Sequence, residues 1–416
     1  MTTDAVTTAD ASSGPYAEAA VLADAAARNE PEWLRDRRAE AVRAFAATPL
    51  PTRVLRPWRY TDVSRLDLAA FAPSEPALRI EGSPPDGAYA GTIEGSLGAG
   101  DAREQLVREH LGALVPGTEG KFQAANAALW RGGVLVHAPD RAVFEAPVVI
   151  DLDASALANA AVFPRLLVIA GERAEVTVVL RLRSGDAPLL AAGTIEVQAA
   201  QAARVRVLID DRWGADTQDY TTIRGRLGRD ADLQVSSLAI GGRVLKQTVE
   251  ISLEGEGAQS AIRAVALGGA NQHFDFVTLQ DHVGPRTASN VEIKAALAGA
   301  SRSVYYGITR VGEGAAGAEA NQVNRNLLLS EHSKADSDPV LEILTADVVR
   351  CGHGATVGPV DEDALFYLQS RGLDRRTALQ LLVGGFFQSV LGDVRIEGVA
   401  EELEATVFAK LATVEL

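Results

Sequence analysis

Short runs of β-prone residues follow one another through the middle of the chain, from about Gly133 to Gly358. PVVIDLD, EVTVVLRL and SVYYGITRV are three of these runs, and Gly, Asp or Ala-Gly turns separate each run from the next. No amphipathic helix pattern stands between the strands, so the order excludes a doubly wound α/β sheet. A β-sandwich, a barrel and a β-solenoid are the architectures that fit.

A loose internal repeat favours the solenoid. A small residue before a strand recurs as Ala174, Ala203, Ala231 and Ala258, at intervals of 29, 28 and 27 residues. Stacked β rungs need small residues at their corners, and they alternate inward apolar with outward polar side chains. The run EVTVVLRL alternates in this way only approximately. The repeat therefore predicts a β-solenoid, with a sandwich as the rival architecture.

Helical patterns precede the strands. In PEWLRDRRAEAVRAFAATP the apolar residues fall at helix spacing between Pro31 and Pro49, and a shorter helix is expected at 101–114. Between these two segments, a Pro/Gly-rich connector at roughly 73–100 predicts a long loop or weak strands. The Thr/Ala/Asp-rich residues 1–15 predict a disordered leader.

Past Gly358 the apolar period becomes helical again. Helices are expected over DEDALFYLQSRG (361–372), over RRTALQLLVGGFFQSVLG with Asp374 as its N-cap, and over roughly 397–410. The second helix carries an apolar stripe of Leu379, Leu382, Val383, Phe386, Phe387 and Val390. A tail this short cannot bury such a stripe alone, so we expect it to pack on the β domain or against a partner.

Composition narrows the class of protein. The chain has 416 residues, 40 basic and 55 acidic side chains, a net charge of −15 and one cysteine. One cysteine excludes an intramolecular disulfide, a zinc site built on thiolates and a four-thiolate iron–sulfur cluster held by this chain alone. The acidic charge argues against nucleic acid and anionic membrane surfaces as partners. Without a secretory pattern or an apolar run of about 18 residues, we expect a cytoplasmic protein.

Two motifs contain residue types found in ligand sites, but their surroundings or spacing do not fit such a site. GEGAAG (312–317) follows a β run, but no parallel β-helix-β unit surrounds it, so a turn is the better interpretation. His273 and His282 are nine residues apart, with Asp275 and Asp281 between them, and this spacing matches no standard zinc or di-iron site. We interpret the four residues as solvated or hydrogen-bonded positions of a strand.

The segment RCGHGATVG (350–358) is the strongest candidate for chemistry. If it is extended, Cys351 and His353 leave the same face, with Cα atoms roughly 7 Å apart at a rise of about 3.3 Å per residue. A thiolate and an imidazole are half of a tetrahedral iron or zinc site, and also half of a Cys/His nucleophilic pair. The alternative is a buried small cysteine and a capping histidine where the β domain meets the helices.

The run PVLEILTADVVRCGHGATVGPVDEDALFYLQSRGLDRRTALQLLVGGFFQSVL (339–391) resembles the core signature of the SufB/SufD family of iron–sulfur cluster assembly proteins. HFDFVTLQDHVGPRTASNVEIKAALAGASRSVYYGITRV continues the resemblance upstream, and PEWLRDRRAEA and PWRYTD resemble the N-terminal domain of the SufD branch. The SufB branch usually carries additional cysteines, so the single cysteine points to the SufD branch.

The resemblance implies a mainly β fold, a right-handed parallel β-helix (solenoid) flanked by N-terminal and C-terminal α-helical domains. With the patterns above, it divides the chain into a disordered leader (1–15), an N-terminal helical domain with its connector (16–120), a β-helix core (121–358) and a C-terminal, ATPase-docking helical domain (359–416).

The resemblance also implies a role. A SufD-like subunit is a non-catalytic scaffold that pairs with a SufB-like subunit and docks SufC-like ABC-type ATPases on its C-terminal helices. His353 matches the family's functional SufD histidine near the subunit interface, and Cys351 matches the accompanying cysteine. One thiolate and one imidazole cannot complete a cluster, so a transient iron or iron–sulfur cluster is expected to be shared across the interface. A reduced flavin is implied for the full complex, without a site in this chain.

Two alternatives stay open. A β-helix enzyme, such as a polysaccharide lyase or hydrolase, would need clustered acids and bases, for which Asp275, Asp281 and His282 are the dense candidates. A Cys/His acyl-transfer enzyme would use Cys351 instead. Within the scaffold hypothesis, the surface meant for a related β-helix is also expected to accept a second copy of this chain, giving a homodimer when the paralogue is absent.

Overall fold

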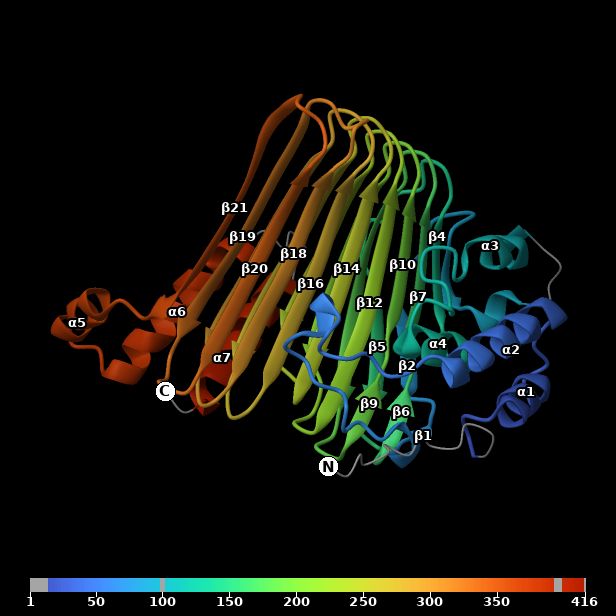
Figure 1. Cartoon of the computed structure of the whole chain (residues 1–416), viewed down its shortest axis with the longest axis horizontal. Coiled ribbons are helices and arrows are strands. Elements are labelled where there is room, and N and C mark those ends of the chain that lie inside the picture. Colours follow the sequence, from blue (N-terminus) through green and yellow to red (C-terminus); the bar gives the residue numbers. More distant parts are fainter. Residues whose placement is uncertain (1–13, 98–101, 393–398, 415–416) are drawn as a thin grey trace.

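The computed structural model describes residues 14–97, 102–392 and 399–414. The predicted leader, 1–15, therefore lies almost wholly outside the described residues. The described chain forms a parallel β-solenoid with helices at its N-terminal and C-terminal ends (Figure 1). The predicted fold class, a mainly β solenoid flanked by helices, is confirmed.

Two sheets make up the solenoid, and beyond the first rung successive long strands alternate between them (Figure 1). The first sheet contains β1 (Ala72–Pro73), β3 (Tyr89–Thr92), β4 (Val134–Ala138), β6 (Ala160–Val162), β7 (Arg165–Ala170), β9 (Leu189–Ala191), β10 (Thr194–Ala199), β12 (Thr217–Leu227), β14 (Val244–Leu253), β16 (His273–His282), β18 (Arg302–Val311) and β20 (Lys334–Ile343). The second contains β2 (Ala77–Glu81), β5 (Val148–Ala154), β8 (Glu175–Ser184), β11 (Arg204–Arg212), β13 (Asp232–Ala239), β15 (Gln259–Gly268), β17 (Ala288–Leu297), β19 (Ala318–Leu328) and β21 (Val348–Pro359). β2 and β3, which come from the Pro/Gly-rich connector, pair antiparallel with β5 and β4, whereas the rungs stack in parallel.

The repeated alanines stand at corners of the solenoid. Ala174, Ala203, Ala231 and Ala258 are all fully buried. The residue before each of them has a positive φ, between 55° and 72°. Each corner thus turns through the left-handed region and then places a small side chain against the next rung, where a larger one would not fit. The interval of 27 to 29 residues is therefore the length of one rung.

Ala202 offers a test of this corner, because it holds a φ of 57° without being glycine. The left-handed region costs a side chain about 1–2 kcal/mol, so Ala202→Gly is expected to stabilise the chain by about 1 kcal/mol. Ala200→Gly is the control: Ala200 lies outside that region, and glycine there should cost about 0.5–1 kcal/mol. Urea unfolding of both variants checks the prediction, and equal stabilities would contradict it.

Helices cover the N-terminal end of the solenoid. They are α1 (Glu18–Ala27), α2 (Glu32–Ala47), α3 (Ala102–His110) and α4 (Lys121–Leu129), with short 3-10 turns at Arg56–Trp58, Leu68–Ala70 and Glu94–Ser96. Their apolar residues share one core with the outer face of the first rungs, for example Leu34 and Phe122 with Leu167. The indole of Trp58, from the PWRYTD segment, stacks on Phe122, with ring centroids 5.5 Å apart.

The C-terminal helices are α5 (Glu362–Ser370), α6 (Arg375–Leu391) and α7 (Val399–Thr413). The side chain of Asp374 accepts a hydrogen bond from the N–H of Thr377, so the predicted N-cap of α6 is confirmed. Val383 and Phe387 of α6 pack on the outer face of the second sheet, against residues such as Val265. Much of the apolar stripe of α6 is thus buried within this chain, which is the first of the two outcomes that the sequence left open.

Candidate functional site

The solenoid ends in an open rung. β21 pairs with β19, and β20 pairs with β18, while the opposite edge of each strand faces no further strand in the described part of the chain (Figure 1). Several large apolar side chains are exposed here, among them Leu344 and Val349, at 61% and 71%. Both Cys351 and His353 lie on β21, at this open edge.

The strand register places the two residues on one face. Cys351 pairs with Ala320 and His353 pairs with Gln322 across the parallel ladder. Ala320 and Gln322 are buried inside the solenoid, and in-register partners share a face. Cys351 and His353 therefore face the interior side of the open end. The extended geometry expected for RCGHGATVG is confirmed.

The environments of the two side chains differ. Cys351 is half-buried and packs beside Val311 and Ala318, whereas His353 is exposed. Partial burial raises the pKa of the Cys351 thiol, and its backbone hydrogen bond with Ala320 opposes this only in part. The thiol form is thus favoured at neutral pH, and a nearby cation or metal would be needed to hold the thiolate.

The pair alone could not complete a metal site. Within the described residues, no three His, Cys, Asp or Glu side chains come together in a way that could hold an ion. A tetrahedral iron or zinc site needs four donors, and this end of the solenoid supplies at most a sulfur and a nitrogen. The remaining donors would have to come from another molecule that meets the open rung.

The other sequence candidates, on β16, do not converge. The two nitrogens of His282 bond to Thr287 Oγ1 and Ser289 Oγ, at 2.8 Å each, and burial lowers its pKa to about 4. Asp281 forms an ion pair with Arg310, 2.5 Å apart, and Asp275 is buried in another ion pair. His273 and Asp275 share the hydroxyl of Thr61 as a partner, while Asp281 and His282 have separate partners. The four therefore do not form the shared groove that a lyase or hydrolase would need. GEGAAG lies in the turn between β18 and β19.

The middle of the chain matches a known family. Residues 153–386, more than half of the chain, match the SufBD core domain of the SUF system for FeS cluster assembly. This chain belongs to the SufBD family. The family's role in iron–sulfur cluster assembly agrees with a last strand, β21, that carries the thiol of Cys351 and the imidazole of His353.

Individual relatives support the assignment. A SufBD family protein of Mycobacterium bovis is 31% identical over 264 residues, which cover 62% of this chain and 66% of that protein. The iron–sulfur cluster assembly protein SufB of Bacillus subtilis is 29% identical over 303 residues, 72% of this chain and 64% of SufB. The chain thus spans about two thirds of the length of these relatives. Because a protein named SufB is among them, the similarities establish the SufBD family without separating its SufB and SufD branches.

A buried charged cluster joins the PWRYTD segment to the solenoid of this SufBD protein. Lys246 Nζ lies 2.7 Å from Asp275 Oδ2, and both side chains are 2% exposed. The hydroxyl of Thr61 donates to the same carboxylate oxygen and also bonds His273 Nε2, at 2.8 Å. Burial lowers the pKa of Lys246 and of His273. Sequence reasoning quoted Thr61, His273 and Asp275 without connecting them, because up to 214 positions separate them, and it did not single out Lys246.

A second feature that sequence reasoning missed is the polar interior behind the open rung. Gln322, Asn324 and Asn326 alternate along β19 and are at most 3% exposed. The alternation in AEANQVNRNLL was a readable signal, since every second residue of a strand faces one side. A run of buried amides inside a solenoid is costly unless the amides are hydrogen-bonded.

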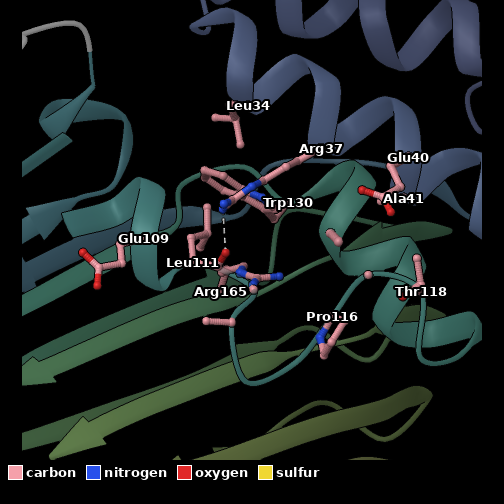
Figure 2. Close-up of a pocket in the computed structure, with 14 residues that line it drawn as sticks. Leu34, Arg37, Glu40, Ala41, Glu109, Leu111, Pro116, Thr118, Trp130 and Arg165 are labelled. Carbon is pink, nitrogen blue, oxygen red and sulfur yellow. Dashed lines mark hydrogen bonds between the residues drawn. The ribbon is translucent and has the colours of Figure 1, made fainter. Parts of the chain in front are cut away.

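A pocket of about 220 Å³ lies far along the chain from Cys351, between α2 and the loop before α4 (Figure 2). Arg37 reaches down from α2 and donates to the carbonyl oxygens of Leu111 and Arg108, both at 2.7 Å. Arg165 lies 2.6 Å from the buried carboxylate of Glu196, which also accepts three backbone N–H groups of the loop. Both guanidinium groups therefore have structural roles, one at the end of α3 and one beneath the loop.

None of the described helices is long and apolar enough to span a membrane.

Proposed function

We propose that this chain is the SufD-like, non-catalytic scaffold subunit of a SufBCD-type iron–sulfur cluster assembly complex. It pairs through its open rung with a SufB-like subunit, and a transient iron or iron–sulfur cluster is held between them as cargo. The observation that carries the proposal is the placement of Cys351 and His353 on β21, which pairs with β19 along one edge and with no described strand along the other. The single cysteine supports the SufD branch. No residue of this chain is assigned to a flavin.

The glycines of β21 support a close partner. A Cβ on Gly352, Gly354 or Gly358 would meet nothing within 4 Å, and none of the three has a positive φ. Nothing within the described chain therefore requires glycine at these positions, and glycine weakens an isolated strand. Glycine in a strand commonly marks the close approach of another backbone. A strand added to β21 by a partner would also satisfy its free backbone groups.

The C-terminal helices are the proposed docking surface for a SufC-like ATPase. Since α6 and α7 bury apolar residues on the second sheet, the surface available to a partner is smaller than the sequence stripe indicated. It includes Phe366 and Tyr367 of α5 and Leu381 of α6, which are 72%, 56% and 48% exposed. Exposed aromatic side chains are typical of binding surfaces.

The test uses the complex assembled in cells. The chain is expressed with SufB-like and SufC-like partners and purified by a tag on this chain, and iron and acid-labile sulfide are measured per complex. His353→Ala is expected to remove most of the cluster while all three subunits still co-purify, because an interface loses one donor but keeps its strand pairing. His332→Ala is the matched control, since His332 is also exposed but lies in the turn after β19.

Unchanged iron and sulfide in His353→Ala would overturn the proposed site. Failure of the wild-type chain to retain either partner would overturn the proposed complex. The mass of the purified chain alone, measured by light scattering with and without the SufB-like partner, identifies a homodimer that uses the same open rung.

A further inference from the structure

The interior of the solenoid changes character along its axis. The inward positions of β7, β8 and β10 are aliphatic, for example Leu166, Val178 and Val197. From β14 onward the interior carries large polar side chains, all at most 3% exposed. They are Gln247, Gln280, Tyr305, Gln322, Asn324 and Asn326. The polar part of the interior thus lies toward the rung that bears Cys351 and His353.

This polarity is unfavourable for stability. The amide nitrogens of Gln247 and Gln280, the hydroxyl of Ser303 and the amide oxygen of Asn326 are buried without a protein hydrogen-bond partner. An unsatisfied buried polar group costs about 1–3 kcal/mol. Aliphatic side chains fill the same positions in the first rungs at no such cost. Polar residues in the last rungs therefore call for a role other than stability.

Gln322 is held from beneath in one orientation. Its Nε2 donates to the hydroxyl of Tyr305, at 2.6 Å, and that hydroxyl lies 3.2 Å from Thr278 Oγ1. Residue 307, beside this pair, is glycine, and a Cβ there would overlap both the Gln322 amide and the Tyr305 ring. With the amide nitrogen on Tyr305, the amide oxygen is the group left to accept hydrogen bonds. Thr309 lies 3.5 Å from that oxygen, at the limit of a hydrogen bond.

We propose that Gln322 is a positioning residue that orients the imidazole of His353. His353 is the in-register partner of Gln322 on the adjacent strand, with both side chains on the interior face. The other inward residues of β21 beyond it, Ala355 and Val357, have no polar side-chain atoms. The amide oxygen of Gln322 is the acceptor that a ring N–H turned toward the interior would reach, and that hydrogen bond would fix the tautomer. The other ring nitrogen then keeps its lone pair directed away from the core.

This arrangement is what a metal-ligating histidine requires. Such histidines donate their second ring N–H to a carbonyl or carboxylate, which fixes the ring and makes the ligating nitrogen more basic. The hydrogen bonds from Thr278 through Tyr305 to Gln322 cross the interior of two rungs, so a hydrogen bond to Gln322 would anchor the orientation of His353 in the core. That this orientation prepares His353 to hold a cluster rests on the proposed function. That Gln322 orients His353 does not.

The test measures the histidine tautomer directly. The chain is labelled with ¹⁵N-histidine, and the ring nitrogens of His353 are assigned by comparison with His353→Ala. Gln322→Leu is expected to change the tautomer ratio of His353 by about 2- to 10-fold, the equilibrium effect of losing one hydrogen bond. Gln280→Leu is the matched control, because Gln280 is another fully buried glutamine that accepts from Ser260, at 2.7 Å, on earlier rungs. Gln322→Glu, which restores an acceptor, is expected to recover the wild-type tautomer.

An unchanged His353 tautomer in folded Gln322→Leu would overturn the inference, as would an equal change in Gln280→Leu. If Gln322→Leu does not fold, Gln322→Met replaces it and the same criterion applies. Iron content separates this inference from the proposed function. If Gln322→Leu changes the tautomer but His353→Ala leaves the iron content unchanged, the positioning role stands and the proposed cluster site is overturned. If His353→Ala loses iron but Gln322→Leu leaves the tautomer unchanged, the cluster site stands and the positioning role is overturned.

Discussion

Replacing Lys246 by methionine is expected to lower the free energy of unfolding by about 3–5 kcal/mol, the usual effect of removing one partner from a buried ion pair. Lys246 Nζ donates to Asp275 Oδ2 and to the carbonyl oxygen of Pro57, and it lies 4.8 Å from the centre of the Trp58 ring. Methionine fills a similar volume, so packing changes little. The carboxylate of Asp275 would then lie buried with Thr61 as its remaining hydrogen-bond donor, and its Oδ1 has no partner even in the wild type.

The loss is expected to be local as well as global. Lys246 connects β14 to residues 56–62, so its removal should also expose that segment to limited proteolysis before the solenoid unfolds. Urea unfolding at pH 7 gives the free energy, and Lys246→Met/Asp275→Asn is the control. The double variant leaves no buried charge at this point and should recover most of the loss. A decrease of less than about 1 kcal/mol in the single variant would show that the ion pair does not stabilise the docking of the segment.

The solenoid could be predicted because its corners repeat in the sequence. Each rung needs a small residue where the chain turns, and Ala174, Ala203, Ala231 and Ala258 record that need at a nearly constant interval. The helices were readable for a similar reason, since Asp374 and the apolar period mark one of them directly. In both cases the structural requirement falls on residues close together in the sequence, so the sequence pattern shows it directly.

The surfaces covered by other elements could not be predicted in the same way. Val179 is an outward residue of β8 that breaks the expected polar alternation, and it is buried beneath the C-terminal helices. The sequence offered two uses for the apolar stripe of α6, and only the packing of Val383 and Phe387 decides between them. These contacts join residues more than 100 positions apart, so no local pattern carries them.

The candidate site was predictable in part. The spacing of Cys351 and His353 implied a shared face, and the strand register confirms it. The polar interior behind the pair was not predicted, although Gln322 and its neighbours on β19 alternate visibly. Which residues these amides face depends on which strand pairs with β19 and in which register. The sequence of β19 alone does not specify that pairing. The roles of the two residues in holding a cluster stay predictions.

A fully buried acid pair in the middle of the solenoid leads to the second large effect. Asp211 and Asp219 are at most 1% exposed and lie within hydrogen-bonding reach of each other. Thr221 and Trp213 donate to the two oxygens of Asp219, at 2.7 and 3.1 Å, while both oxygens of Asp211 lack a donor. Burial raises the pKa of Asp219 to about 6, and burial together with the charge of Asp219 raises the pKa of Asp211.

The sign of the pH dependence follows from these pKa values. An acid whose pKa is raised by folding binds protons more tightly in the native state, so its contribution to stability is present below the unfolded pKa of about 3.9 and is lost as the pH rises. The native chain should therefore lose stability from about pH 4 through pH 6 as Asp219 ionises, and further as Asp211 is forced to ionise. Lys410, whose pKa burial lowers to about 8, offsets part of this repulsion through its attraction to Asp211.

Asp211→Asn is accordingly expected to stabilise the chain at pH 8 by about 1.5–3 kcal/mol, the value of a hydrogen bond to a charged group, because the new amide donates to the carboxylate of Asp219. The gain should shrink at pH 5, where the native pair already holds a proton. Asp210→Asn is the matched control: Asp210 is equally buried but lies 2.6 Å from Arg212, so its replacement should destabilise the chain. Urea unfolding of the wild type and the two variants at both pH values tests the prediction. If Asp211→Asn is not stabilised at pH 8, or is stabilised as much at pH 5, no shared proton holds the pair together.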